Sequence, residues 1–215
     1  MNDEIIIEVN EVFKKYDDAT VLDNVSLEIE KGKIYGLVGR NGSGKTVLMK
    51  CICGLIKPTS GEVKVAGKTV GKDVDIPEDI GVIIETPGFI PNYSGFKNLK
   101  LLASVRNKIS NEEIRKNMEI VGLEPKSRKH VGKYSLGMRQ KLGIAQAIME
   151  KPKILILDEP MNGLDNESVA VVRKILKEQA ENGATIILAS HNREDIDVLC
   201  DKVYTMDHGV IECER

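Results

Sequence analysis

Residues 39–46 read GRNGSGKT and stand between an apolar run, IYGLV at 34–38, and a helical-looking stretch, VLMKCICGL at 47–55. Small residues in such a loop let backbone N–H groups converge on phosphate oxygens, and the following helix adds its positive N-terminal end. The motif therefore predicts a phosphate-binding P-loop. This setting constrains the fold, because a strand must precede the loop and a helix must follow it.

Two side chains of the predicted P-loop have distinct expected roles. Lys45 supplies a point charge for the β and γ phosphates of a nucleotide, and Thr46 offers its hydroxyl to Mg²⁺. A glycine-rich turn without a ligand is the alternative, and it would require neither side chain. The other residues expected to surround the phosphates are Gly39, Asn41, Gly42, Ser43 and Gly44.

The apolar run ILIL at 154–157 ends in two adjacent carboxylates, Asp158 and Glu159. A buried strand delivers such residues to its carboxyl end, where the ligands of open α/β sheets bind. Because neighbouring residues of an extended chain point in opposite directions, we expect Asp158 to serve Mg²⁺ and Glu159 to polarise a water beside the γ phosphate. The alternative is that both acids only open a turn before Pro160.

Wholly apolar runs separated by helices predict a mostly parallel sheet covered on both faces, so the expected fold class is α/β with a P-loop NTPase core. Runs nearer the N-terminus alternate between apolar and polar residues and predict an antiparallel β flank. These alternating runs include IIIEV at 5–9, VSLEI at 25–29 and EVKVA at 62–66. We expect a single domain over residues 1–215.

From about residue 95 to residue 150 the pattern is helical. Ser110 and Glu113 form a capping box before IRKNMEIV, and Gly122 matches a helix stop. No strand-like run interrupts this part of the sequence. We therefore predict a helical subdomain over approximately residues 86–150, inserted between two strands of one sheet.

A third motif, YSLGMRQ at 134–140, opens a predicted helix. The expected core face of this helix consists of apolar residues at helical spacing: Met138, Leu142, Ala145 and Met149. Ser135 and Gly137 stand at the helix start, where a hydroxyl and backbone N–H groups point outward. These groups predict an anion site that has no phosphate in its own chain.

Over essentially its full length, the chain resembles the ATP-binding subunit of ABC transporters. YSLGM is similar to the family signature LSGGQ, NGLD at 162–165 to the D-loop, and Ser190-His191 to the switch histidine. In that family the signature of one subunit closes over the nucleotide held by the P-loop of another. The resemblance therefore implies that Ser135 and Gly137 bind nucleotide across a dimer.

The resemblance also implies roles for three single residues. His191 would sense the γ phosphate and take part in catalysis, Asp165 would lie by the nucleotide at the dimer seam, and Tyr16 would stack on adenine. An ordinary edge-strand aromatic is the alternative for Tyr16, and a satisfied polar side chain at a strand end is the alternative for His191.

Glu85, in IGVIIETPGF, stands where most relatives carry glutamine. Together with YSLGM and PNYSGFKNL at 91–99, it resembles the branch of the family that handles bacitracin, lantibiotics and similar membrane-active peptides. We expect Glu85 to join Thr46 and Asp158 in organising Mg²⁺ and its waters.

The function implied by the resemblance is ATP hydrolysis coupled to transport. Two subunits, expected to be a homodimer, would enclose two ATP molecules with Mg²⁺ and drive a transmembrane permease through the helical subdomain. The expected location is cytoplasmic, peripheral on the inner face of the membrane. The alternatives are a soluble ABC-type ATPase acting on chromosomes or ribosomes, a P-loop kinase or GTPase, and a clasp that uses ATP only as a switch.

Composition excludes several other classes. The chain has 31 Lys and Arg residues against 33 Asp and Glu residues, which argues against a nucleic-acid binder held by a basic face. Its longest apolar runs are far below the roughly 18 residues needed to span a bilayer. The N-terminus opens with acidic residues, so we expect no secretory signal.

The cysteines fit a reducing compartment. Cys51 and Cys53 are separated by one residue, whereas Cys200 and Cys213 lie far away. Reactive pairs usually have two residues between the cysteines, so we predict buried thiols. A redox pair of Cys51 and Cys53 is the alternative.

Overall fold

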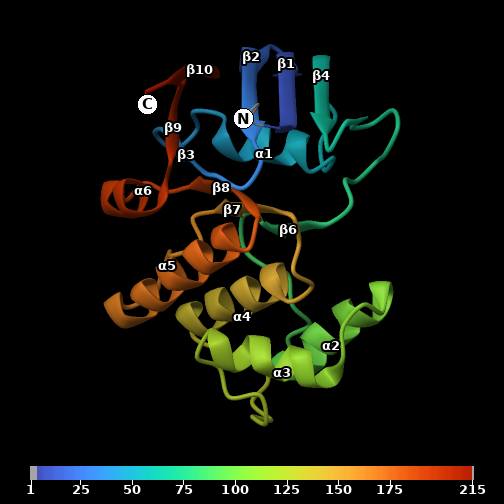
Figure 1. Cartoon of the computed structure of the whole chain (residues 1–215), viewed down its shortest axis with the longest axis vertical. Helices are drawn as coiled ribbons and strands as arrows, with labels where there is room; N and C mark the ends of the chain where they lie inside the picture. Colours follow the sequence, from blue (N-terminus) through green and yellow to red (C-terminus); the bar gives the residue numbers. More distant parts are fainter. Residues whose placement is uncertain (1–3, 215) are drawn as a thin grey trace.

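The computed structural model describes residues 4–214. Its strands are β1 (Ile5–Tyr16), β2 (Ala19–Glu30), β3 (Ile34–Val38), β4 (Ser60–Val65), β5 (Lys68–Thr69), β6 (Ile80–Ile83), β7 (Ile154–Asp158), β8 (Thr185–Ala189), β9 (Lys202–Asp207) and β10 (Val210–Cys213). Its α-helices are α1 (Lys45–Ile52), α2 (Gly95–Arg106), α3 (Asn111–Ile120), α4 (Leu136–Ile148), α5 (Asn166–Glu181) and α6 (Arg193–Leu199), with a 3₁₀ turn at Val131–Lys133. Figure 1 shows the antiparallel strands and α1 above, and α2, α3 and α4 below.

The larger sheet has the strand order β10-β9-β3-β8-β7-β6. All its neighbouring strands pair in parallel except β10, which forms an antiparallel hairpin with β9. Strand β8 is buried at every residue, and β7 is buried up to its last one. Such continuous burial is typical of a parallel strand covered on both faces, so the predicted parallel core is confirmed.

The smaller sheet has the strand order β2-β1-β4-β5 and is antiparallel throughout. Burial alternates along β2, where Val25, Leu27 and Ile29 face inward while the residues between them are exposed. This alternation is the pattern of a sheet with one solvated face. The predicted antiparallel flank is confirmed.

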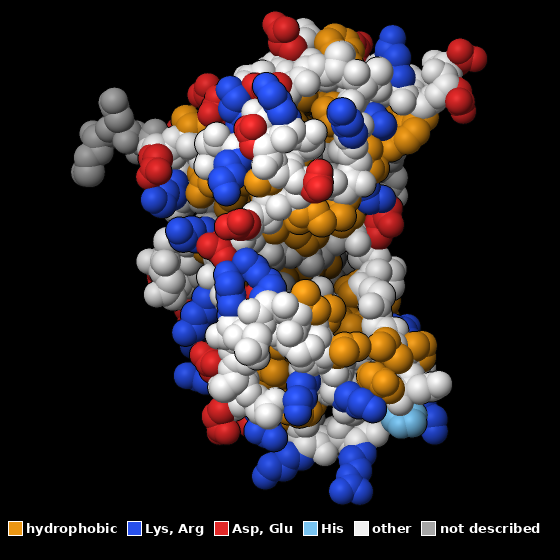
Figure 2. All heavy atoms as spheres, turned by 90° about the vertical axis from the view of Figure 1, so that its right-hand side faces the viewer, with side chains coloured by type: hydrophobic (Ala, Val, Ile, Leu, Met, Phe, Trp, Pro, Cys, Tyr) orange, Lys and Arg blue, Asp and Glu red, His pale blue; other side chains and the backbone are white. Residues whose placement is uncertain are grey.

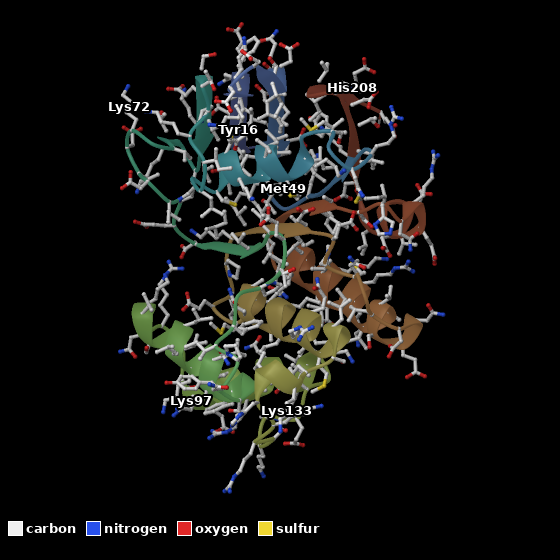
Figure 3. The ribbon with its side chains drawn as sticks, turned by 180° about the vertical axis from the view of Figure 1, so that it is seen from behind. Tyr16, Met49, Lys72, Lys97, Lys133 and His208 are labelled. Atoms are coloured by element: carbon white, nitrogen blue, oxygen red, sulfur yellow. The ribbon has the colours of Figure 1, made fainter. Side chains whose placement is uncertain are left out.

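Two hydrophobic clusters hold these layers together. The first lies between the smaller sheet, α1 and one face of the larger sheet, and it contains Met49 of α1, whose fully buried position is labelled in Figure 3. The second covers the other face of the larger sheet and extends through α4 and α5 to α2 and α3. Helix α4 therefore packs on the sheet and on the lower helices at the same time.

The helical part follows its sequence signals closely. The side chain of Ser110 accepts a hydrogen bond from the Glu113 N–H at 3.2 Å, and the Glu113 carboxylate accepts one from the Ser110 N–H at 2.8 Å. Gly122 follows the helix at a φ of 76°. The capping box and the glycine stop are thus confirmed. Helices α2, α3 and α4 lie within residues 86–150, and the boundaries of a helical subdomain there stay a prediction.

The prediction of buried thiols is confirmed for Cys51 and Cys53, and it is wrong for Cys213, which is exposed, and for Cys200, which is only partly buried. Cys51 and Cys53 are buried in or just after α1, and burial raises the pKa of Cys51 to about 11 and that of Cys53 to about 12. Such thiols are poor nucleophiles at neutral pH. Cys213, by contrast, is exposed, because it ends the edge strand β10.

Across residues 4–214, no helix combines the length and the apolar character required to cross a membrane.

Candidate functional site

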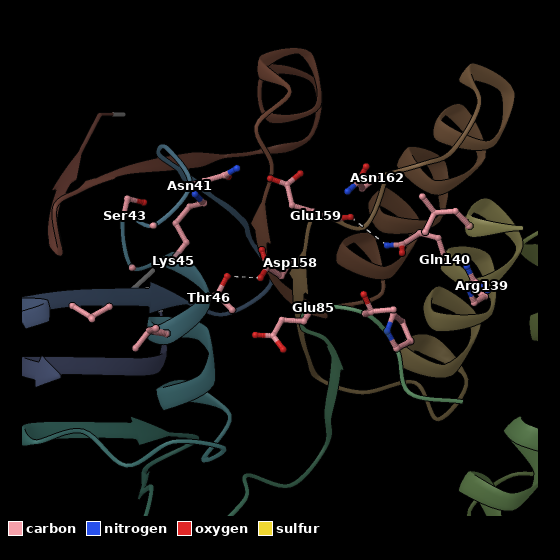
Figure 4. A pocket seen from close by; sticks show the side chains of 17 residues that line it. Asn41, Ser43, Lys45, Thr46, Glu85, Arg139, Gln140, Asp158, Glu159 and Asn162 are labelled. Atoms are coloured by element: carbon pink, nitrogen blue, oxygen red, sulfur yellow. Dashed lines mark hydrogen bonds between the residues drawn. The ribbon is translucent and has the colours of Figure 1, made fainter. Parts of the chain in front are cut away.

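The predicted site segments follow the carboxyl ends of four neighbouring parallel strands. The P-loop follows β3, Glu85 comes shortly after β6, Glu159 follows β7 and His191 comes after β8. Because parallel strands end at the same edge of a sheet, segments far apart in the sequence meet there. A cavity of about 480 Å³ opens at this edge, and Figure 4 shows the side chains that line it.

Close packing requires glycine at position 39 of the P-loop, and a positive φ favours glycine at position 42. Gly39 has a φ of 155°, and a Cβ atom there would lie 2.1 Å from the carbonyl oxygen of Met206. Gly42 has a φ of 81° and no atom within 4 Å of the Cβ position, and it lines the cavity. The loop is therefore packed against β9 on one side and open on the other.

Two polar groups of the P-loop fit an anion. The Oγ atom of Ser43 is buried and has no hydrogen-bond partner within the part of the chain that the structure describes. The Nζ atom of Lys45, a residue only 8% exposed, donates to the carbonyl oxygens of Gly39 at 2.6 Å and Arg40 at 3.1 Å. An unpaired buried hydroxyl is costly, and a phosphate oxygen would satisfy both it and the ammonium charge.

Thr46 and Asp158 meet although they are far apart in the sequence. The Thr46 hydroxyl donates to the Asp158 carboxylate at 2.6 Å, as Figure 4 shows. Among residues 4–214, no group of three or more His, Cys, Asp and Glu side chains could hold a metal. The Thr46 hydroxyl and the Asp158 carboxylate nevertheless fit Mg²⁺, which usually takes one or two protein carboxylates and completes its shell with phosphates and water.

Glu159 departs from the expected extended conformation. Its φ of 50° lies in the left-handed region, which residues other than glycine rarely adopt, so the chain turns here instead of continuing β7. Its N–H donates to the Ala189 carbonyl at 2.9 Å, and its carboxylate lies 2.7 Å from Nδ1 of His191. Asp158 and Glu159 do have different partners, as predicted. Their side chains diverge because the backbone turns at Glu159, however, and not because neighbouring residues of a strand point in opposite directions.

Glu85 lines the cavity, but its carboxylate is paired with Lys50. The Lys50 Nζ and Glu85 Oε1 atoms are 2.5 Å apart, and the Glu85 side chain is 65% exposed. Lys50 was not among the predicted site residues, although it lies four residues after Thr46 on α1 and therefore on the same side of that helix. The predicted role of Glu85 at Mg²⁺ stays a prediction.

The signature segment lies beside the D-loop of its own chain. Ser135 caps α4 by accepting a hydrogen bond from the Met138 N–H at 3.2 Å, and it is exposed. A Cβ atom on Gly137 would lie 3.0 Å from the Gly163 carbonyl oxygen. The described residues that line the cavity do not include Ser135 or Gly137, as expected if both act on another subunit's ligand.

Asp165 and Tyr16 also lie outside the set of described residues that line the cavity. Asp165 caps α5 by accepting a hydrogen bond from the Ser168 N–H at 2.8 Å, and the side-chain and backbone hydrogen bonds of Ser168 lower the pKa of Asp165. Tyr16, labelled in Figure 3, ends β1 and is 44% exposed. The Lys14 ammonium lies 4.8 Å from the centroid of its ring. Its ring is thus available for stacking.

Three residues that the sequence analysis did not single out as binding residues, Arg139, Gln140 and Asn162, also line the cavity. Gln140 is 7% exposed, and its side-chain amide donates to the backbone carbonyls of Glu159 and Pro160. Gln140 ends the YSLGMRQ motif, but its role did not follow from that pattern, because a glutamine beside the apolar face of a helix is usually a surface residue.

Known proteins are similar to this chain over nearly its whole length. The sequence profile of the ABC transporter family matches residues 22–162. An uncharacterized ABC transporter ATP-binding protein, YybJ of Bacillus subtilis, is 48% identical over 96% of this chain and 95% of its own length. The bacitracin transport ATP-binding protein BcrA of Enterococcus faecalis is 43% identical over 96% of this chain and 68% of its own length.

A solved structure shares the fold. It is the dimeric structure of a post-hydrolysis state of the ATP-binding cassette MJ0796 bound to ADP and Pi. It superimposes with a TM-score of 0.87 at 22% identity and covers 98% of this chain and 99% of that one.

Proposed function

This chain belongs to the ABC transporter family as an ATP-binding, ATP-hydrolysing subunit, and from that premise we propose that two copies enclose two ATP molecules and power a membrane permease. The observation that carries the proposal is the meeting of four segments at one sheet edge. The P-loop, the Thr46–Asp158 pair and the Glu159–His191 pair surround or adjoin one cavity. Phosphate binding, metal binding and proton transfer are thereby combined within one subunit.

The proposed chemistry follows from the contacts. Lys45, Ser43 and the backbone N–H groups of the P-loop hold the phosphates, and Thr46 with Asp158 would hold Mg²⁺. When bound, Mg²⁺ neutralises charge on the β and γ phosphates. Glu159 accepts a proton from the attacking water, and His191, 2.7 Å from its carboxylate, orients it beside the γ phosphate.

The second subunit completes each site. Ser135 is exposed at the start of α4, and its hydroxyl hydrogen is available for donation while its oxygen caps the helix. In a two-fold symmetric dimer the same surface serves both subunits, so each signature can reach the other's ATP. The fold neighbour solved as a dimer with ADP and Pi supports this arrangement.

A permease is the proposed membrane partner. A hollow of about 270 Å³ beside β6 is lined by Leu55 and Leu102, which are 55% and 39% exposed, and Val105 nearby on α2 is 82% exposed. Figure 2 shows hydrophobic side chains gathered on both sides of a hollow on one face of the molecule. Exposed apolar patches of this kind mark partner surfaces. The subunit would thus lie peripherally on the inner face of the membrane.

The proposed cargo is a membrane-active peptide. The relative BcrA is described as a bacitracin transport protein, and its similarity covers nearly the whole of this chain. Export of such a peptide, or resistance to it, is the physiological function that we propose for the assembled complex.

Mixing two inactive variants tests the shared sites. A Lys45→Ala subunit lacks a phosphate ligand, and a Ser135→Arg subunit places a bulky side chain where its signature meets the partner's ATP. A mixed dimer keeps one site with both components intact, so the mixture is expected to hydrolyse ATP well above either variant alone. The ATPase rate is measured after purification through a different affinity tag on each subunit.

The control is a mixture of differently tagged Lys45→Ala subunits, in which neither site is intact. Activity of the two-variant mixture no higher than this control, together with nucleotide crosslinking to one subunit alone, would contradict sites shared across the dimer.

Replacing Glu85 by glutamine is expected to leave ATP affinity nearly unchanged, to raise the Mg²⁺ concentration needed for half-maximal hydrolysis, and to reduce peptide resistance more strongly. A carboxylate binds Mg²⁺ and its waters better than an amide does. The shift in Mg²⁺ dependence is about fivefold at most, because an exposed charge of this kind contributes about 1 kcal/mol or less. ATPase rate against Mg²⁺ concentration and peptide resistance of cells are the two measurements.

Two variants accompany this test. Glu78→Gln changes an exposed acid before β6 and should match the parental protein in both assays. Lys50→Met removes the ion-pair partner of Glu85 and leaves the carboxylate. A Mg²⁺ dependence that shifts in Lys50→Met and not in Glu85→Gln would assign the effect to the ion pair and refute a metal-ordering role.

A further inference from the structure

The structure assigns a positioning role to Gln140: we propose that it holds Glu159 of its own subunit in place, and thereby connects the signature helix to the base of its own site. This inference rests on the proposed function, in which the start of the same helix binds the partner's ATP. Gln140 would thus link the two ATP sites of the dimer.

The contact itself is short and buried. The Nε2 atom of Gln140 donates to the carbonyl oxygen of Pro160 at 2.9 Å and to that of Glu159 at 3.2 Å. Figure 4 shows the bond to Glu159 crossing from α4 to the turn after β7. Because Gln140 is only 7% exposed, loss of its donor would leave buried carbonyl groups without this partner.

Glu159 needs such support because of its backbone conformation. A φ of 50° on a residue other than glycine costs free energy and persists only where the surroundings hold it. Its N–H is held by Ala189 at 2.9 Å, and its carbonyl accepts from the Asn162 N–H at 3.1 Å and from Gln140. The first bond comes from β8, the second from the same turn, and the third from α4.

A second contact joins the same two segments. A Cβ atom on Gly163 would lie 2.5 Å from Cδ2 of Leu136, and one on Gly137 would lie 3.0 Å from the Gly163 carbonyl oxygen. The start of α4 and the segment after Glu159 therefore touch without room for a further side chain. A shift of α4 has to displace this segment as well.

Residues near the start of one helix consequently serve different sites. Ser135 and Gly137 face the partner's nucleotide in the proposed dimer, whereas Gln140 contacts the residue that carries the base for its own nucleotide. ATP that binds in one site contacts the start of α4, and a shift of α4 can thus move the Glu159 carboxylate of the other site. This is a direct physical connection between the two hydrolysis events.

The first test is the kinetics of Gln140→Met, which keeps the length of the side chain and loses both donors. ATP affinity should change by less than about twofold, while kcat should fall by about 10- to 100-fold, since small misplacement of a catalytic group costs up to about 10²-fold. Gln140→Glu, which keeps the shape and also loses the donor to carbonyl oxygens, should behave likewise. Gln179→Met, a half-buried glutamine on α5, is the matched control and should retain parental kcat.

The second test asks in which site Gln140 acts. If it acts through Glu159 of its own chain, Gln140→Met damages the same part of the site as Lys45→Ala, so a mixture of these two variants should be no more active than Gln140→Met alone. A mixture of Gln140→Met with Ser135→Arg should regain activity, because one site then has an intact base and an intact signature. If the substitution only weakened α4, it would damage the signature, and Gln140→Met would behave like Ser135→Arg. Activity would then return in the mixture with Lys45→Ala and not in the mixture with Ser135→Arg.

Two results would overturn the proposal: recovery in the mixture with Lys45→Ala and not with Ser135→Arg, or a parental kcat in both Gln140 variants. The Lys45→Ala and Ser135→Arg mixture serves as the reference. If that reference fails to recover, the shared-site function is wrong, and Gln140 is then judged by the kinetics alone. A fall in kcat at unchanged ATP affinity would support positioning of Glu159, and an unchanged kcat would refute it.

Discussion

Replacing Glu159 by glutamine is expected to slow ATP hydrolysis by about 10²- to 10⁴-fold, the contribution of a well-placed general base, while ATP binding is preserved. The amide keeps the shape of the side chain but cannot accept the proton of the attacking water. Since the phosphate contacts of the P-loop remain, the closed dimer should accumulate with uncleaved ATP. Size-exclusion chromatography with Mg-ATP and a steady-state ATPase assay measure the two effects.

A matched control is Glu178→Gln, a carboxylate on the exposed side of α5 that is remote from the cavity. It should hydrolyse ATP at the parental rate and show the parental monomer–dimer distribution. The role assigned to Glu159 is refuted if Glu159→Gln also hydrolyses at that rate, or if it stays monomeric at saturating nucleotide.

Replacing Lys45 by alanine should instead weaken ATP binding itself, by about 10- to 150-fold, which corresponds to about 1.5–3 kcal/mol for a hydrogen bond to a charged group. The Lys45 ammonium also holds the carbonyls of Gly39 and Arg40, so its removal loosens the loop as well as removing a charge. Equilibrium binding of a fluorescent ATP analogue measures the loss.

Because Lys45 is buried, Lys45→Met is the second variant, since it keeps most of the volume and loses the charge. Both should lose affinity to a similar degree, with a thermal midpoint closer to the parental value for methionine. Lys177→Ala, an exposed lysine on α5, is the control for a general effect of lost charge. Parental ATP affinity in both Lys45 variants would contradict the P-loop assignment.

Much of the fold could be predicted because its signals are local. The four apolar residues ILIL at 154–157 predict the buried strand β7, and the four residues from Ser110 to Glu113 predict the capping box. The glycine pattern of the P-loop identified its strand and helix together. Each of these patterns depends on neighbouring residues, and the structure has the corresponding elements where the patterns place them.

The remaining features depend on contacts between distant segments. The turn at Glu159 is held by Ala189 and Gln140, and the carboxylate of Glu85 is paired with Lys50 of α1. Neither arrangement follows from local propensity, because a positive φ on glutamate is disfavoured and a lysine in a helix is usually solvated. Such exceptions to local rules are expected at functional sites.

The two ends of the parallel strands in the larger sheet carry different kinds of segment, and this difference can be used in experiments. The P-loop, Glu85, Glu159 and His191 follow the carboxyl ends of parallel strands, whereas the opposite ends carry short connections such as the one around Gly183, before β8. Gly183 has a φ of 90° and open space around its Cβ position. A reporter group or affinity tag inserted there would be remote from the nucleotide cavity, so distance measurements during turnover could follow the motion of the subunit without altering its chemistry.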